Sequence, residues 1–513
     1  MSDPIARRPH ALIALAIGLA SAAAFQPLAW WPLMPIAIAA LALLIDQAPT
    51  FRRAMLLGWL FGVGQFTVGL NWIATAFTFQ AAMPAWLGWV AVALLSLYLA
   101  VYPMMAAGVA WRVGKGRPLA LVLALGGAWA IAEWLRSVVF TGFPWNPVGA
   151  ALIDTPVAAA LPYIGTYGLS LLTVIGGGLI WLAIRRNWRS AAIAAVPLAL
   201  ASILPSTTLA PLTQPRPIRI VQPNIGQDVK WDPGFERMAL GKLGRLSTPR
   251  DDRQELVFWP EAAVTFPLSD NRPEAAPFVQ ETRRDIATKL SGRDLLMTGG
   301  LTLRSSDGET VDRAANSVFI LGDDGQFVGR YDKSHLVPYG EYLPMRPILS
   351  AIGLSRLAPG DSDFQPGPGP GTLELPEGWG KAGFQVCYEI IFSGRVVDRD
   401  NRPDFIFNPS NDAWFGRWGP PQHLAQARMR AAEEGLPIIR STPTGISALV
   451  DAHGEVVDQL PWRKAGIIWS SIPPKAAQVT PFGRLGNVIP NLLGLLFVAA
   501  AIAIAGRRRY SAI

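Results

Sequence analysis

The sequence predicts an α-helical membrane bundle of about eight transmembrane helices that carries an inserted α/β domain. The first observation is composition: 51% of the 513 residues are hydrophobic and only 16% are charged, which is too apolar for a soluble protein of this length. The second is that the charged residues are unevenly spread, because the first two hundred positions hold few of them and residues 217–473 hold most. This asymmetry predicts two parts of different character.

Eight apolar segments are long enough to cross about 30 Å of hydrocarbon as helices of about 20 residues each. They are residues 10–24, 30–46, 54–78, 85–111, 118–138, 159–184, 189–206 and 487–506. The first two are short and separated only by "FQPLAW", so they also fit a hairpin of partial spans, which leaves the count open by one. A cleavable signal peptide is the weaker interpretation, because a second apolar run follows at once. The predicted division is residues 1–210 with seven spans, 217–475 as a catalytic domain, 487–506 as the eighth span and 507–513 as a cytoplasmic tail.

The basic residues predict the orientation of the chain. They cluster at the ends of apolar segments and in every second short loop: Arg7 and Arg8, Arg52 and Arg53, Arg112 to Arg117, Arg185 to Arg189, and Arg507 to Arg509. By the positive-inside rule these loops and both termini are cytoplasmic, and the insert lies on the opposite face, the periplasm of a bacterium. The expected location is therefore the inner membrane, as a multi-pass protein. The same clustering explains the net charge of +8, so we expect no nucleic-acid partner.

The sequence of the insert predicts alternating strands and helices. It opens with "PIRIVQPN" after a proline-rich linker, and further β-rich runs are interleaved with helix-like segments such as residues 278–290 and 423–434. This alternation is typical of an α/β or layered α+β domain. The four histidines are scattered along the sequence, and there is no cysteine/histidine motif with metal-ligand spacing, so we expect no metal.

Three polar residues follow apolar strand-like runs, where α/β domains place working side chains. Glu261 follows "LVFWP", Lys333 follows "FVGRYD", and Cys387, the only cysteine, follows "GFQV". Taken singly, each also fits a plain structural interpretation: a buried small hydrophobe for the cysteine, a surface carboxylate for the glutamate and a solvated lysine.

Taken together, "FWPEAAVTF", "YDKSHLVPYGEYLP" and "VCYEIIF" resemble, in order and spacing, the glutamate, lysine and cysteine motifs of the nitrilase, or carbon-nitrogen hydrolase, superfamily. The resemblance implies an αββα sandwich in which Glu261, Lys333 and Cys387 are catalytic. It also implies supporting or substrate-binding roles for four further residues: Glu341, Tyr388, Glu389 and Trp231. Strand packing, a surface carboxylate or a core aromatic remain the alternatives for these four.

The membrane half carries a second resemblance. The segment "EWLRSVVFTGFPWNPVG" and the arrangement of spans around a nitrilase-like insert are similar to the membrane-bound N-acyltransferases of this superfamily. That resemblance implies transfer of a fatty acyl chain from a membrane phospholipid, through a Cys387 thioester, to the α-amino group of the amino-terminal S-diacylglyceryl-cysteine of apolipoproteins. It implies a phospholipid donor, an apolipoprotein acceptor, no cofactor and a monomer.

The chemistry needs a base, because a free thiol with a pKa of about 8.5 is mostly protonated at pH 7. We expect Glu261 to remove the thiol proton and Lys333, with a backbone N–H, to stabilise the oxyanion. Two rival functions stay open: a membrane-tethered nitrilase-like amidase, and a catalytically silent scaffold or lipid-binding protein.

Two further features have open interpretations. Glu133 and Arg136 lie three residues apart in an apolar span, so they can form a structural ion pair, or they can contact a lipid headgroup or the catalytic domain. Trp414, Phe415 and Trp418 lie in a loop that can dip into lipid as interfacial aromatics do, with a core position as the alternative.

Overall fold

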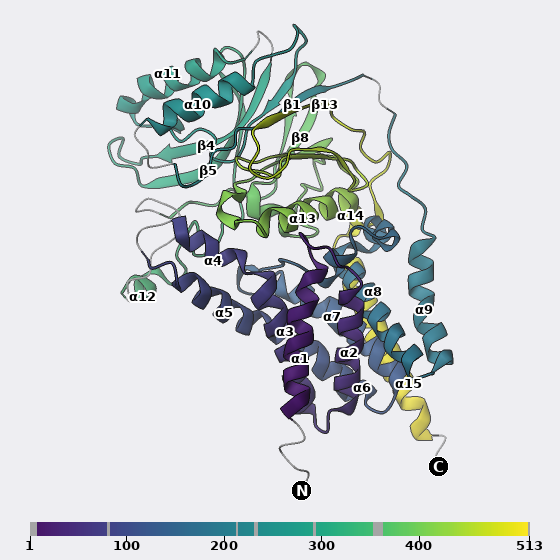
Figure 1. Cartoon of the computed structure of the whole chain (residues 1–513). Coiled ribbons are helices and arrows are strands. Elements are labelled where there is room, and N and C mark those ends of the chain that lie inside the picture. Colours follow the sequence, from purple (N-terminus) through teal and green to yellow (C-terminus); the bar gives the residue numbers. More distant parts are fainter. Residues whose placement is uncertain are drawn as a thin grey trace.

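The computed structural model describes residues 8–79, 83–211, 214–229, 234–290, 294–351 and 363–510. It has a helical part that contains both ends of the chain and an α/β part stacked on one end of it (Figure 1). The helices of the helical part are α1 (Arg8–Ser21), α2 (Leu33–Gln47), α3 (Phe51–Gly69), α4 (Trp72–Ala76), α5 (Leu87–Leu99), α6 (Val101–Gly114), α7 (Pro118–Arg136), α8 (Leu161–Ile184), α9 (Trp188–Ser202) and α15 (Val488–Tyr510).

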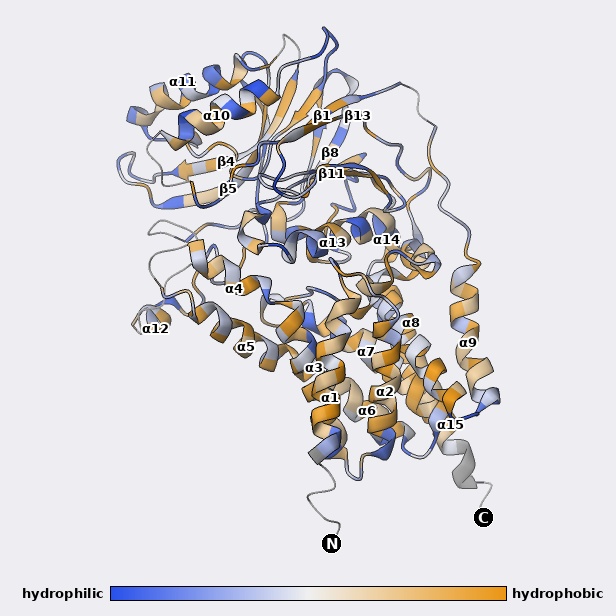
Figure 2. Ribbon diagram, viewed as in Figure 1, coloured by the Kyte–Doolittle hydropathy of each residue, from blue (hydrophilic) through white to orange (hydrophobic). Residues whose placement is uncertain are grey.

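Each of the eight predicted apolar segments folds as helix, so the predicted fold class is confirmed. Among the described residues, four helical stretches are long and apolar enough to cross a membrane: Leu87–Gly114, Pro118–Arg136, Pro156–Ile184 and Val488–Gly506. Helices α3 and α4 pass the same test as a pair bent by 43°. The other three apolar helices, α1, α2 and α9, are shorter. Figure 2 shows the predominantly hydrophobic colouring of this part.

Helix α7 is central to the bundle and packs against α6, α8 and α15. Its close approach to α15 depends on glycine, because a Cβ on Gly127 would lie 2.4 Å from the carbonyl oxygen of Gly494. Small residues that let backbones approach are the usual means of helix association in lipid, where there is no hydrophobic drive between helices.

The α/β part contains two sheets packed face to face. The strands are β1 (Pro217–Gln222), β2 (Leu256–Phe258), β3 (Pro267–Asp270), β4 (Leu295–Arg304), β5 (Arg313–Leu321), β6 (Phe327–Asp332), β7 (Thr372–Leu375), β8 (Gly380–Phe384), β9 (Phe405–Pro409), β10 (Ile438–Ser441), β11 (Ala448–Val450), β12 (Val456–Gln459) and β13 (Gly466–Ser471). The first sheet has the order β13-β1-β2-β4-β5-β6, with β3 beside β4, and the second the order β12-β11-β10-β9-β8-β7. Side chains of both sheets, such as Phe258 and Phe407, share one buried core.

Helices cover the outer faces of this sandwich. Helices α10 (Phe235–Leu246) and α11 (Ala276–Ala287) lie over the first sheet, and α13 (Gly419–Glu434) lies between the second sheet and the helical part (Figure 1). The remaining short helices are α12 (Arg346–Ala351) and α14 (Pro481–Leu485). This is the αββα arrangement predicted for the insert.

The two parts are in direct contact with each other. Glu433 on α13 accepts hydrogen bonds from the backbone N–H and the hydroxyl of Thr166 on α8, both at 2.6 Å. That N–H is free for Glu433 because Gly165, with φ of 65°, interrupts the helix one residue earlier. One hydrophobic cluster contains Trp72 of α4 together with Ile406 and Ile438 of the second sheet.

The aromatic loop packs partly against the helical part, with Trp414, Phe415 and Trp418 half-buried, and its contact with lipid stays a prediction. The ring of Phe415 packs 4.5 Å from that of Trp72, and the ring of Trp414 lies 5.9 Å from Phe79, both in the helical part. The loop therefore contacts protein, because α4 reaches up to it from the bundle.

Candidate active site

Three strand ends converge at one buried position between the two sheets. Glu261 lies just beyond β2, Lys333 directly follows β6, and Cys387 lies three residues beyond β8. Strands β2 and β8 each pair in parallel with a neighbour, and parallel strands deliver the residues at their carboxyl ends to one edge of a sheet. All three side chains are buried, with Lys333 only 1% exposed.

Lys333 lies between two carboxylates. Its Nζ is 2.9 Å from Glu341 Oε1 and 3.6 Å from Glu261 Oε1. Asn316 on β5 donates from Nδ2 to both of these oxygens, at 3.1 and 2.7 Å. The side chains of the predicted Glu341 and Lys333 are therefore in direct contact, whereas Asn316 was not predicted. Its only signal in the sequence was a polar residue inside a strand that pairs with the Lys333 strand.

The electrostatics of this cluster favour a protonated thiol beside a base. Burial raises the pKa of the Cys387 thiol well above its ordinary value, the Glu261 carboxylate adds to the rise, and Lys333 opposes it. Burial also raises the pKa of Glu261, and the positive charge of Lys333 again opposes the rise. For Lys333, burial alone would lower the pKa, but Glu341 and Glu261 outweigh it and hold the pKa above its usual value. At neutral pH the cluster therefore holds an ammonium and a thiol, and nucleophilic attack by the sulfur requires a proton acceptor such as Glu261.

Glu389 connects the lysine loop to the cysteine turn. Its buried carboxylate accepts five hydrogen bonds: from Tyr331 OH at 2.9 Å, Ser334 N at 2.7 Å, Ser334 Oγ at 2.7 Å, His335 N at 3.0 Å and Val386 N at 2.7 Å. The last bond fixes the residue before Cys387, and the other four fix the segment around Lys333. The predicted Glu389 thus contacts the surroundings of two candidate catalytic residues rather than a substrate space.

Tyr388 joins the α/β part to the helical part. Its hydroxyl donates to the carbonyl of Gly142 at 2.9 Å, and its ring packs against Phe143, His335 and Phe392. The fourth supporting residue predicted from the sequence, Trp231, lies outside the described residues.

The loop that Tyr388 contacts is held by two charged residues of α7. Arg136 donates to the carbonyls of Phe143 and Trp145, at 3.1 and 2.7 Å. Glu133 accepts from the backbone N–H of Val148 at 2.9 Å. The structure shows no ion pair between the described residues Glu133 and Arg136; both side chains instead bind loop 142–148, which in turn contacts the catalytic part through Tyr388.

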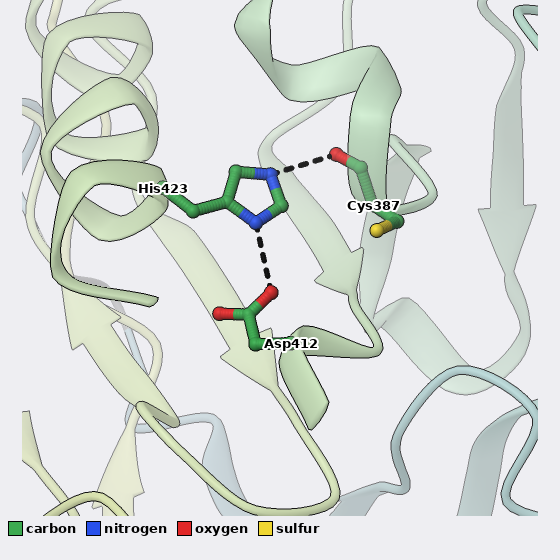
Figure 3. Close-up of side chains that lie close together, drawn as sticks. All are labelled: Cys387, Asp412 and His423. Carbon is green, nitrogen blue, oxygen red and sulfur yellow. Dashed lines mark hydrogen bonds and ion pairs between the residues drawn. The ribbon is translucent and has the colours of Figure 1, made fainter. Parts of the chain in front are cut away.

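His423 on α13 lies against the cysteine turn, a contact that was not predicted from the sequence. Its Nδ1 is 2.8 Å from Asp412 Oδ1, and its Nε2 is 3.1 Å from the backbone carbonyl oxygen of Cys387 (Figure 3). The thiol, carboxylate and imidazole offer ligand atoms within 4.8 Å of one another, which raises the question of a metal.

The residues do not fit a metal site. Both imidazole nitrogens of His423 already have protein partners, and Asp412 pairs with the guanidinium of Arg440. That guanidinium also lies 3.1 Å from Nδ1, so its charge would repel a cation at this position. The cluster is better explained as a hydrogen-bond network around the turn.

Comparison with known proteins finds a matching family for each of the two parts of the chain. Residues 17–179 match the family model of the apolipoprotein N-acyltransferase N-terminal domain, and residues 218–482 match that of carbon-nitrogen hydrolases. An apolipoprotein N-acyltransferase of Rhodopseudomonas palustris is 35% identical over 510 residues, covering 93% of this chain and 92% of the relative. One of Bradyrhizobium diazoefficiens is 36% identical over 530 residues, covering 98% and 95%. Among solved structures, Saccharomyces cerevisiae Nit3, a nitrilase-superfamily member, aligns with a TM-score of 0.37 at 18% identity over 52% of this chain and 94% of that chain.

Proposed function

The chain belongs to the apolipoprotein N-acyltransferase family, and we propose that it moves a fatty acyl chain from a membrane phospholipid to the α-amino group of the amino-terminal S-diacylglyceryl-cysteine of apolipoproteins. The observation that carries the chemistry is the buried cluster of one thiol, one carboxylate and one ammonium at Cys387, Glu261 and Lys333. Relatives that match along nearly the whole chain, membrane helices included, favour this reaction over a membrane-tethered nitrilase-like amidase.

In the first half-reaction, Glu261 takes the proton of the Cys387 thiol as the sulfur attacks the carbonyl carbon of a phospholipid ester. The oxygen that becomes negative is stabilised by the ammonium of Lys333; removing one such donor typically costs about 2.7 to 4 kcal/mol of barrier. Collapse breaks the ester C–O bond, and the proton on Glu261 passes to the departing alkoxide, which leaves as a lysophospholipid. The acyl chain remains on Cys387 as a thioester.

In the second half-reaction, the free amine of the lipoprotein attacks this thioester. Glu261 accepts a proton from the amine, the C–S bond breaks, and the proton returns to the thiolate of Cys387. Both half-reactions move an acyl group between nucleophiles, so we propose no metal or organic cofactor. Contact of the active site with the helical part, through Tyr388 and loop 142–148, supports substrates delivered from a lipid bilayer.

We propose the inner membrane as the location, with the domain of residues 217–475 on the periplasmic face, spans at 1–210 and 487–506, and 507–513 as a cytoplasmic tail. The support is that α1 begins and α15 ends at the end of the bundle remote from the α/β part (Figure 1), and that basic residues of separate loops bind neighbouring loops or helix ends. Lys115 donates to the carbonyls of Ala48 and Pro49 in the loop before Arg52, and Arg185 pairs with Asp46. Positive residues at one end orient that end toward the cytoplasm. We further propose that the enzyme acts as a monomer.

The test is acyl transfer by purified protein from a phospholipid with a labelled acyl chain. We expect label to move to a synthetic diacylated lipopeptide with a free amino terminus, and no transfer from a Cys387→Ser variant. Release of labelled free acid at the same rate with and without the lipopeptide would instead support the amidase. Digestion of the α/β part by protease added to spheroplasts, but not to intact cells, tests the periplasmic location.

A further inference from the structure

The backbone at Cys387 is strained and held by contacts from several elements. Cys387 opens the short helix η9 (Cys387–Ile391) with φ of 53°, a left-handed conformation that residues other than glycine rarely adopt. Such a conformation is unfavourable and persists only where the surroundings enforce it. A turn of this kind fixes the direction in which the sulfur points.

The anchors of the turn come mostly from the second sheet. The N–H of Gln385 donates to the carbonyl of Phe407 at 3.0 Å, and the carbonyl of Gln385 accepts from Asn408 Nδ2 at 2.6 Å. The N–H of Val386 is bound by Glu389. These bonds fix the chain before the nucleophile, and the contact from His423 to the carbonyl of Cys387 fixes the nucleophile itself.

The contact between His423 and Cys387 depends on which nitrogen of the imidazole carries the hydrogen. A backbone carbonyl can only accept, so the contact with Cys387 is a hydrogen bond in the tautomer that carries its hydrogen on Nε2, and in that tautomer Nδ1 accepts from the guanidinium of Arg440. Because Nε2 contacts the carbonyl oxygen, the imidazole is not placed to take the proton of the thiol (Figure 3). At Nδ1 the ring meets the carboxylate of Asp412 at 2.8 Å and a guanidinium nitrogen of Arg440 at 3.1 Å.

The imidazole is itself held from both parts of the protein. His423 is fully buried. Besides Asp412, Arg440 on β10 binds Asn408 at 2.5 Å and Ser410 at 2.9 Å, and these bonds fix the position of its guanidinium. From the helical part, the ring of Trp145 packs 5.3 Å from the imidazole and donates from Nε1 to Gln422, the preceding residue, at 2.8 Å.

We propose that His423, oriented by Asp412, Arg440 and Trp145, is a positioning residue that holds Cys387 in its strained conformation by donating a hydrogen bond to the Cys387 carbonyl. The inference rests on the proposed function, because it concerns acylation of this sulfur. Trp145 makes the position of the nucleophile depend on loop 142–148 of the helical part, so the bundle contributes to the active site as well as anchoring it.

Two substitutions at His423 separate this role from general structural support. In His423→Asn the amide can occupy the position of Nδ1 and keep the contact with Asp412, but it is too short to reach the Cys387 carbonyl. In His423→Gln the amide nitrogen can occupy the position of Nε2 and restore the donor. The rate of Cys387 acylation is measured for each variant with labelled phospholipid and, separately, with a water-soluble p-nitrophenyl ester, which needs no lipid. Thermal unfolding in detergent reports the folded fraction.

We expect the Asn variant to lose about 10- to 100-fold in the rate constant of acylation with both substrates, because a small misplacement of a reacting atom costs that much. The phospholipid concentration that gives half the maximal rate should not change, and the Gln variant should recover most of the rate. An Asn variant as fast as the wild type would overturn the proposal, as would folded Asn and Gln variants that are equally slow. If the Asn variant does not fold, an active Gln variant supports the proposal and a folded but slow one refutes it. Zinc bound to the wild-type protein at one ion per chain and lost from the Asn variant would also refute the proposal.

The two substrates separate this proposal from the proposed function. A wild-type protein that is acylated by the nitrophenyl ester but never by phospholipid would refute the proposed donor. The acylation rates of the Asn and Gln variants could still be compared with the nitrophenyl ester, so the role of His423 would still be tested.

Discussion

Replacing Glu389 by glutamine should uncouple the lysine loop from the cysteine turn while changing hardly any volume. The carboxylate is buried and accepts from four donors through Oε1 and from the N–H of Val386 through Oε2. A glutamine amide offers only one acceptor oxygen. If that oxygen keeps the four donors around Lys333, the amide NH₂ faces the N–H of Val386, and two donors oppose each other.

The expected loss of stability follows from the loss of one hydrogen bond, the one between the N–H of Val386 and Glu389. A hydrogen bond to a charged group contributes about 1.5 to 3 kcal/mol, and the N–H of Val386 is left buried without a partner. The four remaining bonds also weaken, because their acceptor is no longer charged. We expect a lower unfolding temperature and a loss of about 100-fold in the rate of Cys387 acylation, since the sulfur is no longer fixed relative to Lys333.

The assay compares Glu389→Gln with Glu274→Gln, a substitution of a glutamate whose side chain is 76% exposed. Acylation is followed with labelled phospholipid, and unfolding by heating in detergent. The control should match the wild type in both. If Glu389→Gln acylates at the wild-type rate, the connection between the two loops is not what positions the sulfur, and the reasoning is refuted.

Three other perturbations follow from the same geometry. Lys333→Met removes the ammonium and should lower the acylation rate about 100- to 1,000-fold, as loss of an oxyanion donor does; a smaller loss than tenfold in a single-turnover assay would exclude that role. Since Glu261 must be ionised to act as a base and burial raises its pKa, the acylation rate should fall on acidification at a pH above the ordinary carboxyl value of about 4.3. A pH–rate profile whose acid limb lies at or below that value would contradict this. Tyr388→Phe removes the donor to Gly142 and should destabilise contact between the parts by about 1 kcal/mol, seen as faster proteolysis of loop 142–148; unchanged proteolysis would exclude the hydroxyl as a connection.

The sequence was sufficient for the fold class and for the grouping of the three central residues. Period-two apolar runs place strands, and polar residues that follow them reach the same edge when the strands are parallel. Strand-end positions marked Glu261, Lys333 and Cys387 as candidates, the resemblance to the nitrilase superfamily predicted their grouping, and the structure brings them together.

What could not be predicted depends on how helices dock. His423 lies 36 residues from Cys387 along the chain and reaches it only because α13 packs beneath the second sheet. Phe415 has the hydropathy of a lipid-facing residue, yet its ring packs against Trp72 of α4, and hydropathy alone cannot distinguish lipid from an apolar protein surface. Asn316 became significant only when β5 paired with β6, which placed it beside Lys333.

The central claim is that the sulfur of Cys387 carries the acyl chain between donor and acceptor. Because the chain has a single cysteine, mass spectrometry of the peptide that contains it gives an unambiguous readout. After incubation with phospholipid alone, we predict that this peptide gains the mass of one fatty acyl group, that hydroxylamine removes it, and that a diacylated lipopeptide removes it while gaining the same mass. Acylation of the lipopeptide with no acyl group ever found on Cys387 would contradict the account.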